Sequence, residues 1–380
     1  MSNDSINTLD RRLVFAGLTL LALGWVMVGS ASISIAANKI DQPFFYFIRQ
    51  GVFAGIGLLA AWFVVSINLS VWQRLAPKLM VLGLFLLLLV LIPGIGREVN
   101  GSTRWLPVGP INIQVAELIK LFAIIYMADY LQRYHKQLTG SVIKVVAPLT
   151  VLFLAAFFLL MQPDLGSVVV IMSTALAMLF LAGARLDLFA GLIAVAGTSF
   201  AALAWLSPYR LKRLTSFLDP WADPFGSGFQ LTQALIAFGR GDWLGVGFGS
   251  SLQKLFYLPE AHTDFLFSVL GEELGLLGGL TVLALFVVLI WRALAIGRAA
   301  ELQGQNFGAQ LAYGIGIWLG LQACINMGVN MGVLPTKGLT LPLMSYGGSS
   351  LVIVCVAIAL LLRVDLETRF PEKAAARLRR

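Results

Sequence analysis

Charged residues, histidine and cysteine are all scarce in this sequence. Asp, Glu, Lys and Arg make up 12% of the 380 residues, against about 25% in an average soluble protein. The two cysteines exclude a disulfide scaffold. The two histidines, His135 and His262, lie far apart in the chain and on opposite sides of the expected membrane, which argues against a histidine-based zinc site.

Apolar residues, in contrast, are abundant. They account for 58% of the chain, and the mean hydropathy is +0.86. A soluble globule of this length cannot bury that much apolar surface. The apolar residues form unbroken runs, such as 79–93, whereas a transmembrane β-barrel alternates apolar and polar residues. We therefore expect an all-α polytopic membrane protein.

Ten apolar stretches are long enough to cross a bilayer, which takes roughly 17–25 residues per helix. They are 13–36, 45–66, 76–93, 115–131, 145–161, 167–184, 187–206, 265–290, 309–332 and 346–363. The first is too long for a signal-peptide core and lacks a convincing cleavage site, so we expect it to be retained. Ten spans leave no room for an appended soluble domain, and we expect one integral-membrane domain over 1–380.

The basic residues predict the orientation of these spans. An even number of spans places both termini on one side, and most of the 27 lysines and arginines fall on that side. Both termini are therefore expected in the cytoplasm, including a basic tail over about 364–380. This bias also explains the net charge of +8 without any nucleic-acid partner.

Three segments are then external. A polar loop covers 94–113, a short loop covers 334–345, and the longest loop, about 207–264, joins spans seven and eight. Within the longest loop, 229–238 is expected to form a short interfacial helix and the glycine-rich 245–250 a turn.

Charges inside a span cost roughly 2.5–3.5 kcal/mol each on insertion scales, so each is a functional hypothesis. Glu117 and Lys120 are three residues apart at the start of the fourth span and share a helix face. They are either a structural ion pair or part of a site, and the two roles are compatible. Asp164 follows Pro163 between two spans and is either a helix cap or a site residue.

Glu260, His262 and Asp264 crowd into five residues where the longest loop meets the eighth span. An apolar boundary disfavours a charged carboxylate and raises its basicity, which suits a general base. The alternative is structural, with Thr263 or Asp264 acting as the N-cap of the helix.

Two further clusters lie on the external side. Arg210, Lys212 and Arg213 could hold a phosphate or pyrophosphate, or could snorkel at the membrane edge. The glycine- and hydroxyl-rich stretch 345–350 opens the last span, and it either binds substrate or packs a helix start.

Several stretches together resemble the SEDS family (shape, elongation, division and sporulation) over essentially the whole chain. They are 100–105, 114–120, 162–166, 237–241, 257–265 and 337–342 running into 345–350. The forms of 257–264 and 336–338 resemble division-type members more than rod-elongation members. Two departures occur: Val115 replaces the proline of the family's Gln-Pro-x-Glu, and Phe256 stands where division members often carry an acid.

The resemblance implies a peptidoglycan glycosyltransferase that polymerises lipid II on the periplasmic face of the cytoplasmic (inner) membrane at the division septum. Asp264 is the essential carboxylate by resemblance, and it would act as general base with inversion at the donor sugar. A flippase for the lipid-linked precursor and a division scaffold are the alternatives. Clustering of ionisable groups at the external span ends favours surface chemistry over transport.

The expected substrate-binding set combines these clusters with the matched motifs. It comprises Arg104, Gln114, Glu117, Lys120, Asp164, Arg210, Lys212, Arg213, Glu260, His262, Thr263, Lys337, Ser345, Tyr346, Gly347, Gly348 and Ser349. No cofactor is certain, although a divalent cation, Mg²⁺ or Mn²⁺, could help to neutralise the pyrophosphate. The resemblance also implies a class B penicillin-binding transpeptidase, FtsI, and the division proteins FtsQ, FtsL and FtsB as partners.

Overall fold

A computed structural model describes residues 9–99, 102–109, 111–138, 140–205, 217–335 and 338–370. Each of the ten expected spans coincides with a long helix. These helices are α1 (Arg11–Ile40), α2 (Phe45–Ser66), α3 (Leu69–Val90), α4 (Val115–Tyr134), α5 (Val142–Met161), α6 (Leu165–Leu181), α7 (Leu186–Trp205), α10 (Leu266–Leu302), α11 (Asn306–Asn330) and α12 (Gly348–Arg369).

Within the described residues, seven of these helices are long and apolar enough by themselves to cross a membrane. Helix α6 has only 17 residues, and α4 carries charged side chains at both of its ends. The seven long apolar helices show that the chain is a multi-pass membrane protein. Because helices such as α4 and α6 are not among the seven, the count of ten membrane crossings stays a prediction.

The helices extend beyond the predicted apolar runs at their polar ends. Helix α3 begins at Leu69 rather than at 76, and α10 continues to Leu302 rather than ending at 290. An apolar run reports only the part of a helix that lies in hydrocarbon, whereas the hydrogen-bonded backbone continues into the interfacial region.

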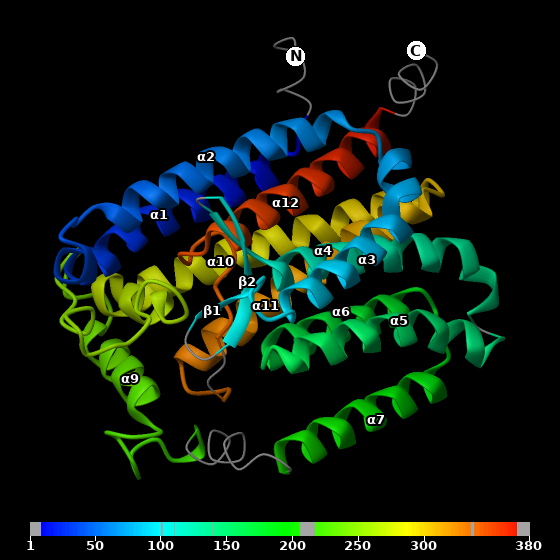
Figure 1. Cartoon of the computed structure of the whole chain (residues 1–380). Helices are drawn as coiled ribbons and strands as arrows, with labels where there is room; N and C mark the ends of the chain where they lie inside the picture. Colours follow the sequence, from blue (N-terminus) through cyan, green and yellow to red (C-terminus); the bar gives the residue numbers. More distant parts are fainter. Residues whose placement is uncertain are drawn as a thin grey trace.

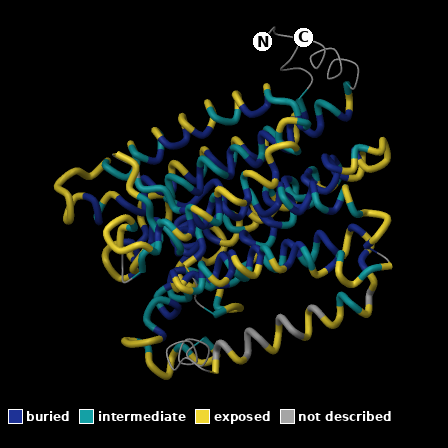
Figure 2. The backbone as a smooth tube through the Cα atoms, turned by 45° about the vertical axis from the view of Figure 1, so that its right-hand side comes forward, coloured by how far each residue is buried: buried dark blue, intermediate teal, exposed yellow. Residues whose placement is uncertain are grey.

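The long helices lie side by side in one bundle (Figure 1). Helices α2 and α12 lie side by side, α10 and α11 run through the middle, and α7 lies at the edge. Buried residues gather in the middle of the bundle and exposed residues on its outside (Figure 2). Asp10, just before α1, forms ion pairs with Arg292 of α10 and with Arg369 at the end of α12. The start of α1 and the end of α12 therefore lie on the same side of the bundle, which agrees with an even number of spans.

The segment expected as a polar loop contains a small antiparallel sheet, so that expectation is wrong, whereas the expected all-α membrane fold is confirmed. The sheet has the order β1 (Arg97–Val99), β2 (Ser102–Val108) and β3 (Ile111–Gln114). Gly109, in the turn between β2 and β3, has a φ of 59°, which such hairpin turns require. The strands escaped detection because they are short and β2 contains Pro107, so the composition of the segment resembles that of a loop. The sheet holds Arg104 over the helix ends.

The long external loop contains α9 (Phe229–Gly241), which confirms the expected short helix. After it, the chain returns to α10 at a break in that helix. Gly275 has a φ of 66°, and the carbonyls of Asp242 and Trp243 accept from the backbone N–H groups of Leu276 and Leu277. These hydrogen bonds attach the first turns of α10 to the long external loop.

Candidate functional site

Asp264 lies in the turn immediately before α10 and is partly buried. The N-cap of α10 is Phe265, without any side-chain capping hydrogen bond. The alternative interpretation of Thr263 or Asp264 as an N-cap is therefore wrong. Among the described residues, no hydrogen bond is made to the Asp264 carboxylate, which leaves it available to a ligand.

The surroundings of Asp264 raise the pKa of its carboxyl group to about 7. Burial is the largest cause, because it disfavours the charged form. The negative charges of Glu260 and Asp164 raise the pKa further, and the positive charge of Arg104 opposes them. Tertiary structure brings these charges together from separate segments of the chain.

The loop 338–347 forms one wall beside Asp264. A Cβ atom at Gly338 would lie 3.1 Å from Asp264 Oδ2, so the backbone approaches the carboxylate closely. The next residue, Leu339, packs against Gly166 at the start of α6. The α5–α6 turn and the loop 338–347 therefore meet at the site.

Arg104 of β2 binds the same α5–α6 turn. Its guanidinium donates hydrogen bonds to the carbonyls of Gln162, at 2.9 Å, and Pro163, at 2.6 Å. Asp164 caps α6 by accepting from the backbone N–H and hydroxyl of Ser167. The cap role of Asp164 is thus confirmed, and its charge still contributes to the potential at Asp264.

Glu260 and His262 approach from the segment before Asp264. Glu260 has a φ of 57°, and its carboxylate accepts from the Thr263 hydroxyl at 2.8 Å. The His262 ring packs against Tyr46 and Tyr346, with centroids 4.6 and 5.6 Å away. Burial lowers the pKa of His262, and its buried Nδ1 has no partner within the described residues. Burial therefore favours the neutral imidazole form of His262.

Glu117 and Lys120 form the expected ion pair, with 2.7 Å between Lys120 Nζ and Glu117 Oε1. Lys120 Nζ also donates to Gln322 of α11, and Ser350 of α12 donates to Glu117. Both charges are buried, at 3% and 1% exposure. The ion pair therefore joins α4, α11 and α12, and the two partners of Lys120 leave its ammonium poorly placed for a pyrophosphate.

The glycine- and serine-rich start of α12 packs tightly against its neighbours. The Ser349 hydroxyl accepts from the backbone N–H of Gln114 and donates to the carbonyl of Asn112, which ties α12 to the sheet. A Cβ atom at Gly348 would meet the Phe53 ring at 2.5 Å. The Ser345 hydroxyl accepts from Leu341 within its own loop. These contacts match the packing alternative for 345–350.

Other expected site residues fall elsewhere. Arg210, Lys212, Arg213 and Lys337 lie outside the described residues. Gly347, which has an extended backbone, precedes α12. Within the ranges that the structure describes, no three His, Cys, Asp or Glu side chains are grouped so as to hold a metal ion.

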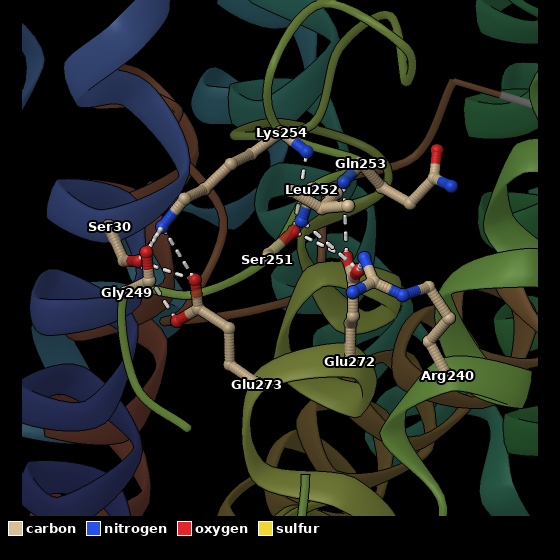
Figure 3. Close-up of polar contacts among 9 residues, drawn as sticks. All are labelled: Ser30, Arg240, Gly249, Ser251, Leu252, Gln253, Lys254, Glu272 and Glu273. Carbon is tan, nitrogen blue, oxygen red and sulfur yellow. Dashed lines mark hydrogen bonds and ion pairs between the residues drawn. The ribbon is translucent and has the colours of Figure 1, made fainter. Parts of the chain in front are cut away.

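Two buried glutamates of α10 that bind the long external loop were not identified from the sequence. Glu272 and Glu273 of α10 have no exposed surface. Glu272 accepts from Arg240 and from Ser251, Leu252 and Gln253, whereas Glu273 accepts from Ser30 and Lys254 (Figure 3). Their signal was present in the sequence, as adjacent charges inside an apolar run. They fix the outer loop to the helix that follows Asp264.

A cavity of about 660 Å³ lies at the outer end of α2. Its lining includes the cation Arg49 and the apolar residues Phe44, Ile48, Val52 and Ile56. These four side chains recur every four residues and are exposed, so one stripe of α2 faces outward. The spacing of four could have indicated this stripe, and Arg49 was missed because it sits inside an apolar run. The cavity offers an apolar groove with a positive charge.

A family model described as "Cell cycle protein", covering FtsW, RodA and SpoVE, matches residues 11–370. A protein of Nitrosococcus halophilus with the curated name "Probable peptidoglycan glycosyltransferase FtsW" is 62% identical over 365 residues, covering 96% of this chain and 94% of the relative. A Legionella pneumophila relative with the same name is 53% identical, covering 96% and 93%.

Solved structures are also similar. One, reported under "Structural coordination of polymerization and crosslinking by a peptidoglycan synthase complex", has a TM-score of 0.78 and 33% identity, covering 95% of this chain and 98% of the other. The rod shape determining protein RodA of Thermus thermophilus has a TM-score of 0.69 and 30% identity, covering 94% and 97%. The helical arrangement described above is thus shared with both.

Proposed function

Since the chain belongs to the family of cell cycle proteins that includes FtsW, RodA and SpoVE, we propose that it polymerises lipid II into glycan strands, with Asp264 as general base. It is a peptidoglycan glycosyltransferase, as its close relatives are named. The observation that carries the role of Asp264 is a carboxylate without a hydrogen bond from any described residue, whose pKa is raised to about 7.

The acceptor sugar hydroxyl is a poor nucleophile and needs a base within hydrogen-bond reach. A base whose pKa lies near the working pH combines a large ionised fraction with a strong pull on the proton. Asp264 takes the proton from the acceptor 4-hydroxyl as the new glycosidic bond forms. An α-linked donor and a β-linked product require a single displacement with inversion, and no covalent intermediate arises.

The departing lipid pyrophosphate carries negative charge that cations must stabilise. Arg104 lies near enough to lower the pKa of Asp264, but its guanidinium already holds the α5–α6 turn. Arg210, Lys212 and Arg213 remain candidates by sequence. No step of this mechanism passes through a metal ion.

The cavity beside α2 suits the lipid part of the substrate. Its apolar stripe faces outward along the helix, and Arg49 provides a cation at the same place. Tyr46 on α2 packs against His262, two residues before Asp264. The groove and the base are therefore neighbours, which lets the polyprenyl tail stay in the bilayer while the sugars react outside it.

The cellular setting follows from the same proposal. The protein resides in the inner membrane at the division septum with its site on the periplasmic face. FtsI, a class B penicillin-binding transpeptidase, crosslinks the strands, and FtsQ, FtsL and FtsB join the assembly. One of the similar solved structures is of a peptidoglycan synthase complex that coordinates polymerisation and crosslinking, which supports pairing with a crosslinking enzyme.

The test is glycan-strand formation from purified lipid II in detergent. Wild type, Asp264→Asn and Asp264→Ala are compared, each with and without FtsI. Polymer from wild type alone supports the enzyme and its base together. Activity in Asp264→Asn would remove Asp264 as the base. No polymer from folded wild type under either condition would favour a transporter or a scaffold.

A further inference from the structure

Two buried asparagines on α11 lie directly behind Asp264. Asn326 and Asn330 are four residues apart and so share one face of the helix. They are only 2% and 0% exposed. A buried amide is costly unless it is hydrogen-bonded, so its partners indicate its role.

Both asparagines hold the same backbone atom. Asn326 Nδ2 and Asn330 Nδ2 each donate to the carbonyl oxygen of Asp264, and both distances are 2.9 Å. Asp264 lies in a turn outside the helix, where no helical hydrogen bond fixes its backbone. The two amides therefore replace helical restraint at this residue.

Asn326 reaches a second segment as well. Its Nδ2 donates at 2.6 Å to the carbonyl of Leu339. Leu339 follows Gly338, whose backbone lies against the Asp264 carboxylate. One side-chain amide thus bridges the turn that carries Asp264 and the loop 338–347 that faces it.

Asn330 is itself held on its other side. Its Oδ1 accepts from the backbone N–H and the hydroxyl of Ser268 in the first turn of α10. Its Nδ2 also donates to the carbonyl of Asn326. Ser268, Asn330 and Asn326 therefore connect α10, α11 and the Asp264 turn in one satisfied network.

We propose that Asn326 is a positioning residue that sets the Asp264 carboxylate against the loop 338–347, with Asn330 as its support. This inference rests on the proposed function, in which Asp264 is the base. Neither asparagine needs to touch the substrate. Their effect passes through the backbone of Asp264.

The expected kinetic effect is on turnover. A misplacement of about 1 Å in a reacting group can cost about 100-fold in rate. Asn326→Ala removes both hydrogen bonds that Asn326 donates and so breaks its bridge between the Asp264 turn and the loop 338–347, while Asn330 still holds the Asp264 carbonyl. We expect kcat to fall by about 10- to 100-fold with little change in KM for lipid II, since the binding groove beside α2 is unchanged.

A pH profile separates positioning from folding. Among the described residues, the charges of Glu260, Arg104 and Asp164 act on the pKa of the Asp264 carboxyl group. Movement of its carboxylate relative to these groups shifts the acidic limb of the kcat profile. Reduced stability alone lowers the yield of folded protein but leaves the midpoint of that limb in place.

The experiment compares wild type, Asn326→Ala, Asn326→Asp and Gln310→Ala as full-length protein purified in detergent. Activity is expressed per monodisperse protein. Asn326→Asp has nearly the same shape, and its buried acid can donate to only one of the two carbonyls, so an intermediate kcat is expected. Gln310 is a buried amide elsewhere on α11, 6% exposed, and its removal should leave kcat and the pH midpoint unchanged.

The outcomes distinguish the two proposals. If Asp264→Asn is inactive while Asn326→Ala and Asn326→Asp keep the wild-type kcat and pH midpoint, positioning by Asn326 is wrong. If kcat falls equally in Gln310→Ala, the effect is structural and the proposal is also wrong. If Asp264→Asn remains active, the base assignment itself fails.

Discussion

Arg104 in the sheet and Pro163 in the α5–α6 turn are joined by a 2.6 Å hydrogen bond from the guanidinium to the proline carbonyl. This contact places a positive charge near Asp264, where it opposes the effect of burial on the pKa of Asp264. The sheet therefore has an electrostatic consequence for the candidate base.

Removal of that charge should make Asp264 harder to ionise. In Arg104→Ala, the pKa of Asp264 rises above about 7, so the acidic limb of polymerisation activity moves to higher pH. Activity at neutral pH falls and recovers partly in alkaline buffer. A kcat profile from acidic to alkaline pH checks this, with Arg104→Lys as the charge-preserving control. A limb that moves to lower pH would contradict the assignment.

Wild-type activity should itself depend on pH through Asp264. The base works only when ionised, and its pKa is about 7. Polymerisation should therefore increase as pH rises through about 7 and then level off. Rates from purified lipid II at saturating substrate measure this. A rate that stays the same on both sides of neutral pH would show that Asp264 does not limit the reaction as a base.

The same shift predicts a stability effect. Since folding raises the pKa of Asp264 from 3.8 to about 7, the folded protein binds its proton more tightly than the unfolded chain does. The ionised carboxylate thus destabilises the fold, increasingly as pH rises from about 4 to 7. Asp264→Asn should raise Tm, by more in alkaline than in acidic buffer. A lower Tm for this variant in alkaline buffer would contradict the argument.

The buried pair predicts a different kind of defect. Lys120→Ala leaves the Glu117 carboxylate, which is 3% exposed, buried without its cation. Breaking a buried ion pair typically lowers the free energy of unfolding by about 3–5 kcal/mol. Both the yield of folded protein and the activity should drop. The matched control is the double variant Lys120→Met with Glu117→Gln, which leaves no buried charge and should recover much of the Tm. Equal Tm for Lys120→Ala and wild type would show that the pair is not structural.

The close approach of Gly338 to Asp264 can be tested with one methyl group. A Cβ atom there would lie 3.1 Å from Asp264 Oδ2, so Gly338→Ala should displace the carboxylate and lower kcat several-fold without lowering Tm. Gly140→Ala is the control, because a Cβ atom there meets nothing within 4 Å. An unchanged kcat in Gly338→Ala would show that the loop 338–347 can shift to accept the methyl group without displacing the Asp264 carboxylate, which would contradict the prediction.

Glu273 should hold the outer loop to α10. Its partner Lys254 is 6% exposed, and Glu273→Ala leaves this ammonium buried without its carboxylate. We expect faster hydrogen exchange over 249–254 and a lower Tm. The double variant Glu273→Gln with Lys254→Met removes both charges and should restore protection more than either single change. Protection equal to wild type in Glu273→Ala would contradict this role.

The sequence predicted the helices because each apolar run is a local property. Helices α1, α2 and α5 match the expected stretches closely, since about 20 apolar residues in lipid have few alternatives to a helix. The pairing of Glu117 with Lys120 and the capping by Asp164 were also local, at separations of three residues. The sheet over 97–114 escaped because its strands are short and one of them contains proline.

By itself, the sequence determined that this protein is a multi-pass helical membrane protein, and it singled out Asp264 as a candidate base. Only the tertiary structure decided what surrounds that carboxylate. Asn326 donates a hydrogen bond to Asp264 from 62 residues away, and the charge of Arg104 acts on the Asp264 carboxylate from 160 residues away. Burial, charge and hydrogen bonding at Asp264 depend on these long-range contacts, which no local pattern of residues encodes.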